Sequence, residues 1–300
     1  MKLTIKVSVV FMLLTTLVLN GCGSKDDGSS QGGTESSSDD KTIQVEGSDT
    51  MVNLAQAWSE KYQADNSDVT IEVSGGGSGV GISSLIQGLA DMANASRKMK
   101  DKEKARAESE LGVAPIEYVV GQDALAVYVH KDNPLEEITL SQLESIYADG
   151  GTISKWSELD IELPGGSDEI VRVSRQNNSG TYAYFREAVL KDNDFKLGSI
   201  DLSGSSDVVS MVEKTASAIG YSGMGYATDN VKMLKIKSTD DGDAVAPTAD
   251  NVINGTYPIA RPLMIYTAGE PNDTLQTYLD WILGENGQGI VSEMGYVPVK

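Results

Sequence analysis

The sequence predicts an α/β fold in which a mixed, mostly parallel sheet is flanked by helices. The first observation is a pattern that occurs three times: an alternating, strand-like run, a turn rich in Ser, Thr and Gly, and an amphipathic run with helical spacing. The second is that 300 residues with 40% hydrophobic side chains can bury a sizeable core. The chain after about residue 42 therefore suits one large domain or two lobes.

The chain begins with features of an export signal. Lys2 and Lys6 precede the apolar run Val7–Leu19, which is too short to span a bilayer. The run and the Cys that follows it resemble the signal of bacterial lipoproteins, in which lipid is attached to the Cys. We therefore expect residues 1–21 to be a signal peptide and Cys22, the only cysteine, to carry a lipid anchor. The alternative is a free exposed thiol.

Residues 22–41 are expected to form a solvated tether, because the stretch after Cys22 contains no large apolar side chain. The formal net charge of the whole chain is −20, and the sequence contains no basic run. Nucleic acid is therefore excluded as a partner. A small anion is not excluded, because a buried site is governed by the donors that line it.

The first two turns carry hydroxyl groups and glycines. Thr42–Glu46 alternates like a strand and leads into Gly47–Met51, and Val69–Ser74 leads into Gly75–Gly79. The four glycines around Ser78 indicate close approach of the backbone to another group, or positive φ angles. A plain flexible loop remains the alternative for this turn.

The third turn follows the strand-like run Ile170–Ser174 and precedes an amphipathic helix. A strand-to-helix turn leaves the first N–H groups of the helix unpaired at the positive end of its dipole, which makes a natural anion seat. Ser179 and Thr181 add hydroxyl donors, Gly180 permits close approach, and Arg175 offers a planar fork of N–H donors. The alternative is an ordinary capped helix.

The remaining elements alternate between strands and helices. Strands are expected at Pro115–Val120, Ala124–Val129, Ala218–Ser222 and Tyr257–Thr267. The pattern of Thr139 and Gln142 predicts a capping box that opens a helix through Tyr147. Further helices are expected around Val208–Val212 and Leu275–Ile282.

Short catalytic patterns are not found in the sequence. The dinucleotide fingerprint fails because Val80 stands where a glycine is required, and no Gly-Lys-Ser/Thr nucleotide loop occurs. The Gly-x-Ser-x-Gly elbow of hydrolases fails at both Ser78 and Ser222, and the only histidine, His130, is expected at the surface end of a strand. We therefore expect no enzyme activity, no cofactor and no metal site.

Four loops together resemble a known family. The fourth, Ala95-Ser96-Arg97, follows another strand-like run, and the most specific pattern is Arg-x-x-x-Ser-Gly-Thr over residues 175–181. From about Ile43 to the C-terminus, the chain resembles the phosphate-binding proteins of bacterial phosphate ABC transporters. That family has the two-lobed, type II periplasmic-binding-protein fold, with the ligand in the cleft between the lobes.

The resemblance implies a ligand, partners and a site. The ligand would be inorganic phosphate, and the partners would be the membrane permease and ATPase subunits of a transporter at the outer face of the bacterial cytoplasmic membrane. One lobe would comprise residues 42–120 and 257–300, and the other residues 121–256. The implied site residues are Asp49, Thr50, Met51 through its N–H, Ser78, Ser96, Arg97, Arg175, Ser179, Gly180 and Thr181.

One departure from the family concerns selectivity. Arg97 stands where well-known members have an Asp, which accepts a hydrogen bond from the O–H group that phosphate keeps near neutral pH and so disfavours sulfate. We hypothesise that Asp49 supplies this acceptor, with Arg97 either pairing with Asp49 or facing the anion. The alternative is that Asp49 only caps its helix.

Two other functions remain open at this stage. The same fold with sulfate or another tetrahedral oxyanion as its ligand is one of them. A secreted phosphoesterase is the other, although the sequence offers no identifiable general base near a serine.

Overall fold

The computed structural model describes residues 41–164 and 167–299. The predicted signal peptide, Cys22 and the tether up to residue 40 lie outside the described residues. Lys41, which we assigned to the tether, is the first residue of a strand and pairs with Val69. Within the part of the chain that the structure describes, no helix is long and apolar enough to cross a membrane.

The described residues form four hydrophobic cores, two in what we call the first lobe and two in the second. The sheet of the first lobe has the strand order β2-β1-β3-β12-β4, and β1 is parallel to both of its neighbours. Its strands are β1 (Lys41–Gly47), β2 (Val69–Gly76), β3 (Met92–Ala95), β12 (Ala260–Thr267) and the first half of β4 (Ile116–His130).

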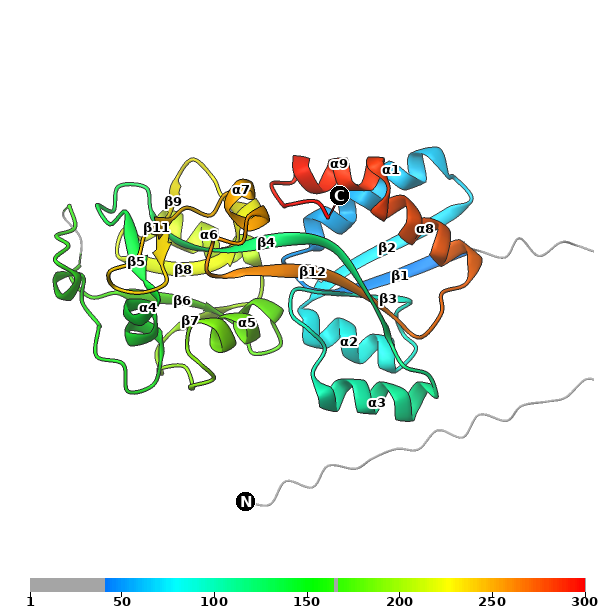
Figure 1. Ribbon diagram of the computed structural model, residues 1–300, viewed down its shortest axis with the longest axis horizontal. Helices are drawn as coiled ribbons and strands as arrows, with labels where there is room; N and C mark the ends of the chain where they lie inside the picture. The colour runs from blue at the N-terminus through cyan, green and yellow to red at the C-terminus, as the bar shows by residue number, and fades with distance from the viewer. Residues whose placement is uncertain (1–40, 165–166, 300) are drawn as a thin grey trace, which may run out of the picture. The chain divides into compact units, whose positions relative to one another are not determined.

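Helices cover both faces of this sheet (Figure 1). One core packs α1 (Val52–Asp65), α8 (Asp273–Leu283) and α9 (Glu285–Glu293) against the sheet. The core on the other face involves α2 (Ser78–Ile86) and α3 (Asp101–Leu111). Helices α3 and α9 are not among the elements predicted from the sequence.

The second lobe continues the same sheet in the order β4-β8-β6-β7, with β9 paired to β4, and adds a small sheet in the order β11-β10-β5. Helices α4 and α5 pack in one core and α6 in another. The strands are β5 (Glu137–Thr139), β6 (Val171–Arg175), β7 (Ile200–Leu202), β8 (Ala218–Gly223), β9 (Val231–Met233), β10 (Lys235–Lys237) and β11 (Ala244–Val245). The helices are α4 (Leu140–Tyr147), η1 (Trp156–Leu159), α5 (Gly180–Ala188), α6 (Ser205–Lys214), η2 (Met224–Tyr226) and α7 (Ala249–Ile253).

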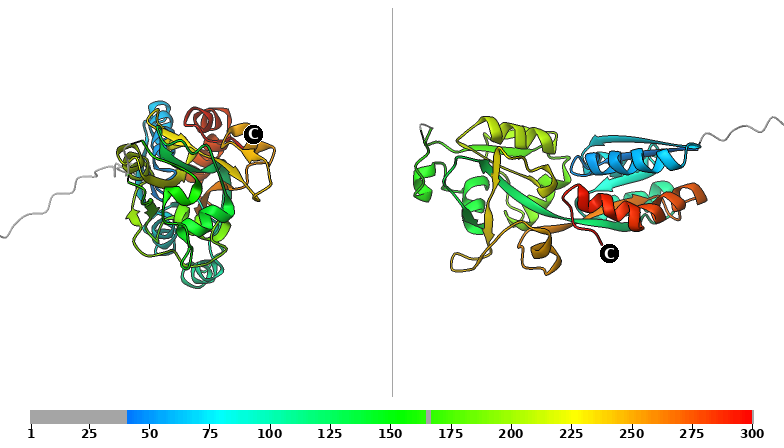
Figure 2. Two further views of the ribbon diagram at one scale, coloured as in Figure 1. Left: turned by 90° about the vertical axis from the view of Figure 1, so that its left-hand side faces the viewer. Right: turned by 90° about the horizontal axis from the view of Figure 1, so that it is seen from above.

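Two long strands carry the chain between the lobes, as Figures 1 and 2 show for β4 and β12. Val120 and Leu263 belong to a core of the first lobe, whereas Ala124 and Ile259 belong to a core of the second. We predicted two strands separated by Gly121-Gln122-Asp123, but β4 is continuous over Ile116–His130. The reason is pairing: β12 runs antiparallel to β4 from Ile116 to Ala124 and keeps the backbone extended, with one irregularity near Leu263.

The sheet is mixed, as predicted, but it is not mostly parallel: among the described strands, five pairs are parallel and five are antiparallel. All antiparallel pairs among the described strands involve β4, β12 or the β10–β11 hairpin, and the outer strands of both lobes pair in parallel. The predicted capping box is confirmed: the Thr139 hydroxyl accepts from the N–H of Gln142, and the Gln142 side chain accepts from the N–H of Thr139.

A glycine allows α2 to lie directly on the first sheet. A Cβ atom at Gly81 would lie 2.3 Å from the carbonyl oxygen of Glu46 in β1, which is far inside van der Waals contact. No atom lies within 4 Å of the corresponding position at Gly289 in α9.

We therefore expect Gly81→Ala to lower the free energy of unfolding by about 1–3 kcal/mol, because helix and strand must separate to admit the methyl group. The matched control Gly289→Ala should raise it by about 0.5–1 kcal/mol, because alanine is the better helix former. Urea denaturation measures both values. Equal stability of the two variants would contradict the packing described here.

Candidate functional site

The predicted turns meet between the two lobes in what we call the hydroxyl cluster, formed by Ser48, Thr50, Ser78, Ser96, Ser179 and Thr181. All six side chains are buried. The hydroxyls of Thr50 in the first lobe and Thr181 in the second lie 2.9 Å apart. The Ser48 hydroxyl donates to that of Ser96 over 2.8 Å, and the Ser78 hydroxyl accepts from the N–H of Ser96 over 3.1 Å.

Gly180 brings the second lobe against the first. A Cβ atom at Gly180 would lie 2.2 Å from the hydroxyl oxygen of Ser78 and 2.6 Å from that of Ser96. Gly180 is the first residue of α5, and Ser78 is the first residue of α2, so neither N–H has an acceptor within its own helix. Two helix N-termini, one from each lobe, therefore adjoin the hydroxyl cluster.

Backbone contacts join the loops around the cluster. The N–H of Gly79 donates to the carbonyl of Asn178 over 3.0 Å, and the Asn178 side chain donates to the carbonyl of Gly76 over 2.8 Å. Gly77 has φ +92°, and a Cβ atom there would lie 2.6 Å from the Asn178 carbonyl oxygen. The glycines of this turn therefore permit close backbone approach, and the alternative of a plain flexible loop is wrong.

Asp49 links the two lobes rather than capping a helix. One carboxylate oxygen accepts from the N–H of Gly76 over 3.0 Å, and the other accepts from the Arg175 guanidinium over 3.1 Å. The N-cap of α1 is Met51, and no side chain at this position caps the helix by a hydrogen bond. The Met51 N–H, which we predicted as a ligand donor, donates to the carbonyl of Ser48 over 2.8 Å.

The side chain of Arg175 is buried and forms hydrogen bonds with residues of both lobes. Besides Asp49, it donates to the carbonyl of Ser203 and, over 2.8 Å, to the hydroxyl of Ser205. Burial lowers the pKa of Arg175 below its ordinary value, and the Asp49 carboxylate offsets only part of this lowering. An arginine keeps its charge under such a shift, so the pair is ionic at neutral pH.

Arg97 pairs with Glu103, so the predicted Arg97–Asp49 pair is wrong. Two N–H groups of Arg97 each donate to one oxygen of Glu103 over 2.8 Å, and the side chain of Arg97 is 8% exposed. Burial raises the pKa of Glu103, but hydrogen bonds from Arg97 and from the backbone N–H of Lys100 lower it. The lowering effects together are larger, so the pKa of Glu103 lies below the ordinary value. Arg97 therefore fixes the loop between β3 and α3.

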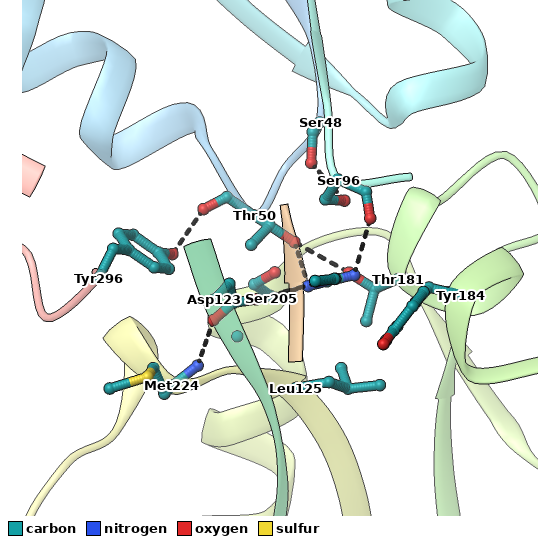
Figure 3. A network of polar contacts seen from close by, with 12 residues as sticks. Ser48, Thr50, Ser96, Asp123, Leu125, Thr181, Tyr184, Ser205, Met224 and Tyr296 are labelled. Atoms are coloured by element: carbon teal, nitrogen blue, oxygen red, sulfur yellow. Dashed lines mark hydrogen bonds and ion pairs between the residues drawn. The ribbon is translucent and has the colours of Figure 1, made fainter. Parts of the chain in front are cut away.

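Two residues of the site were missed from the sequence, namely Asp123 in β4 and Arg261 in β12. Both side chains are 0% exposed, and one oxygen of Asp123 accepts from Arg261 over 2.8 and 3.0 Å. Arg261 also donates to the Thr50 hydroxyl and to the Ser96 carbonyl, each over 3.3 Å. The other oxygen of Asp123 accepts from the N–H of Met224 over 3.0 Å, so this network reaches both lobes (Figure 3).

Burial raises the pKa of Asp123, and the charge of Arg261 together with its hydrogen bonds opposes this rise. The signal available in the sequence for this pair was a charged residue beside an apolar run, Asp123 before Ala124–Val129 and Arg261 before Leu263–Ile265. The site as a whole offers buried hydroxyls, helix N-termini and guanidinium groups around one point. That set of donors suits a small oxyanion.

We expect Asp123→Asn to lower the free energy of unfolding by about 3–5 kcal/mol, because Arg261 is left buried without a counter-charge. The double variant Asp123→Leu, Arg261→Met should lower the free energy of unfolding by less than Asp123→Asn does, because no unpaired charge is left buried. The exposed Asp192, which pairs with Arg186 over 4.0 Å, supplies the control Asp192→Asn, for which we expect a change below about 1 kcal/mol. Similar losses from both single Asn variants, in thermal or urea unfolding, would refute the role given to the buried pair.

The sequence of this chain is similar to sequences of known proteins. Residues 32–286 match the model of a PBP superfamily domain. The chain is 34% identical to the phosphate-binding protein PstS of Pseudomonas aeruginosa, covering 84% of this chain and 81% of the relative. It is 32% identical to PstS of Staphylococcus epidermidis, covering 95% and 86%.

A solved structure shares the fold. The substrate-binding protein of a phosphate ABC transporter from Clostridium perfringens, with bound phosphate, has a TM-score of 0.77 and 31% identity to this chain, and the match covers 86% of this chain and 100% of that one. The chain therefore belongs to the PBP superfamily and, within it, to the family of the phosphate-binding proteins PstS.

Proposed function

We propose that this protein binds inorganic phosphate between its two lobes and delivers it to an ABC transporter outside the cytoplasm. The single observation that carries the proposal is the hydroxyl cluster, which is assembled from both lobes and includes the 2.9 Å contact between Thr50 and Thr181. The family supports the proposal, because the relatives are named for phosphate binding and the Clostridium perfringens protein holds phosphate.

The donors of the cluster suit a phosphate ion. Five of its hydroxyls now bond to one another, and the sixth, that of Ser179, caps α5 by accepting from the N–H groups of Thr181 and Tyr182. An anion placed among them would take over these hydrogen bonds, and the lobes would separate slightly to admit it. Each hydrogen bond to a charged group contributes about 1.5–3 kcal/mol, and dehydration of the anion and the cost of association offset much of the sum. A dissociation constant of about 1 μM or below is the expected result.

The proposed ligand set follows the geometry. Thr50, Ser78, Ser96, Ser179, Gly180 and Thr181 would surround the phosphate, with Arg175 adding positive charge from the second lobe. Asp49 would accept a hydrogen bond from the protonated oxygen of the phosphate while it holds Arg175. The N–H of Met51 and the side chain of Arg97 make their hydrogen bonds within the first lobe, so the proposal gives them supporting roles.

The proposal includes anchoring and transport partners. Lipid on Cys22 would hold the mature protein at the outer face of the membrane, and residues 22–40 would give it reach. The permease and ATPase subunits of the transporter would receive the phosphate. We propose lobe limits near those predicted, with residues 42–120 and 257–300 in one lobe and 121–256 in the other. The core residues Tyr257 and Ile259 favour a return crossing slightly later, before Leu263.

The protein would bind and release its ligand without a covalent step. The relatives found are named as binding proteins. Isothermal titration with phosphate, sulfate and a chromogenic phosphate ester separates the alternatives. Tight binding of phosphate and no release of chromophore are expected, whereas the absence of phosphate binding would refute the proposed function.

We expect Ser78→Ala to weaken phosphate binding roughly tenfold to hundredfold, because one hydrogen bond to the anion is lost. The matched control is Ser59→Ala, since Ser59 is also a buried serine of the first lobe but donates to the carbonyl of Ile71 over 3.1 Å. Isothermal titration measures both dissociation constants. If the two variants bind phosphate alike, Ser78 is not a ligand.

We expect Asp49→Asn to lower the ratio of phosphate affinity to sulfate affinity on the order of tenfold or more, because the acceptor for the phosphate O–H group is lost. Asp91→Asn is the control, since Asp91 also accepts from a backbone N–H, that of Gln44 over 2.8 Å. Competition titrations give the ratio of the two affinities. Equal weakening of both anions would mean that Asp49 only positions Arg175.

A further inference from the structure

A basic cavity of about 450 Å³ adjoins the hydroxyl cluster. Its walls come from the loop between β3 and α3, from α5 of the second lobe, and from β12. Its basic lining residues are Arg97, Lys98, Lys100, Arg186 and Arg261. The acidic lining residues are Glu187 and Asp192. Cationic groups thus gather at one place in a chain whose net charge is −20.

The cations of this cavity fall into two groups. Arg97, Arg186 and Arg261 each have a carboxylate partner, at 2.8 Å from Glu103, 3.0 Å from Asp194 and 2.8 Å from Asp123 respectively. Among the residues that the structure describes, Lys98 and Lys100 form no ion pair, and both are exposed. The two lysines are therefore the cations of the lining that have no ion-pair partner, and Glu187 and Asp192 of the same lining offset part of their charge.

Lys100 faces positive charge from both lobes. Partial burial lowers its pKa, and so do Arg97 and Lys102 of the first lobe and Arg186 of the second, while Glu103 opposes them. Like charges that approach across two lobes repel each other, and an anion between them removes the repulsion. The arrangement is therefore suited to a small multivalent anion that contacts both lobes.

The cavity is connected to the hydroxyl cluster through Arg261. This side chain lines the cavity, donates to the Thr50 hydroxyl and donates to the Ser96 carbonyl. Its guanidinium also lies 5.7 Å from the ring centre of Tyr184, which lines the same cavity. An anion in the cavity would therefore be separated from the hydroxyl cluster by a single layer of side chains.

We propose that this cavity is an outer anion site, where Lys98 and Lys100 capture phosphate before it enters the hydroxyl cluster. The proposal rests on the proposed function and adds a route of entry to it. A local positive field within an acidic protein raises the concentration of an anionic ligand near its binding site and so accelerates association. Dissociation from the closed cluster does not depend on the outer site.

Stopped-flow measurement of phosphate association and dissociation tests the outer site, with the full chain and the double variant Lys98→Gln, Lys100→Gln. We expect the association rate constant to fall about threefold to tenfold and the dissociation rate constant to stay unchanged. Added salt should slow association of the unaltered protein. In the variant, this dependence should shrink or reverse, because the remaining field of the acidic chain repels the anion.

The matched control is Lys131→Gln, Lys235→Gln, which removes the same charge from exposed positions of the second lobe outside the cavity lining. An equal fall in association for both double variants, or an unchanged rate in the first, would overturn the outer site while phosphate binding itself persists. Failure of the unaltered protein to bind phosphate would instead refute the proposed function, and the outer site with it. Circular dichroism confirms that each variant is folded.

Discussion

The buried ion pair between Asp123 and Arg261 is the interaction on which the rest of the structure depends. The two residues are cross-strand partners on β4 and β12, the strands that carry the chain between the lobes. Arg261 reaches Thr50 and Ser96 of the first lobe, and Asp123 reaches the N–H of Met224 in the second. Because the charges are fully buried, they hold this arrangement in a single geometry.

In the proposed function, this position would let the lobes move without losing the site. The contacts that join the lobes across the hydroxyl cluster are hydrogen bonds and one ion pair, between Thr50 and Thr181, between Asn178 and the glycine turn, and between Asp49 and Arg175. Opening of the lobes breaks these contacts. The Asp123–Arg261 pair lies within strands that both lobes share, so it can persist and keep the first-lobe loops in place.

The sequence was informative wherever the signal is local. A turn followed by a helix is encoded in adjacent residues, so the loops that carry Thr50, Ser78 and Ser179 could be located before the structure was known. The ion pair was missed because its partners are 138 residues apart and meet only through strand pairing. Helix α3 was missed because Ala107 is its only buried residue, which gives almost no apolar periodicity. Neither alternative considered for Arg97, pairing with Asp49 or facing the anion, therefore included its partner Glu103 in α3.

The charges around the site differ between the hydroxyl cluster, which would retain the anion, and the cavity, which would capture it. Arg175 is balanced by Asp49 and Arg261 by Asp123, so the hydroxyl cluster is surrounded by compensated charges. Its hold on an anion would come from oriented hydroxyls and helix N-termini, whose hydrogen bonds are buried and little screened by salt. Attraction from a distance needs positive charge that is not held in an ion pair, which Lys98 and Lys100 would supply at the cavity. Retention and capture would then depend on different residues, and an acidic surface would be compatible with an anionic ligand.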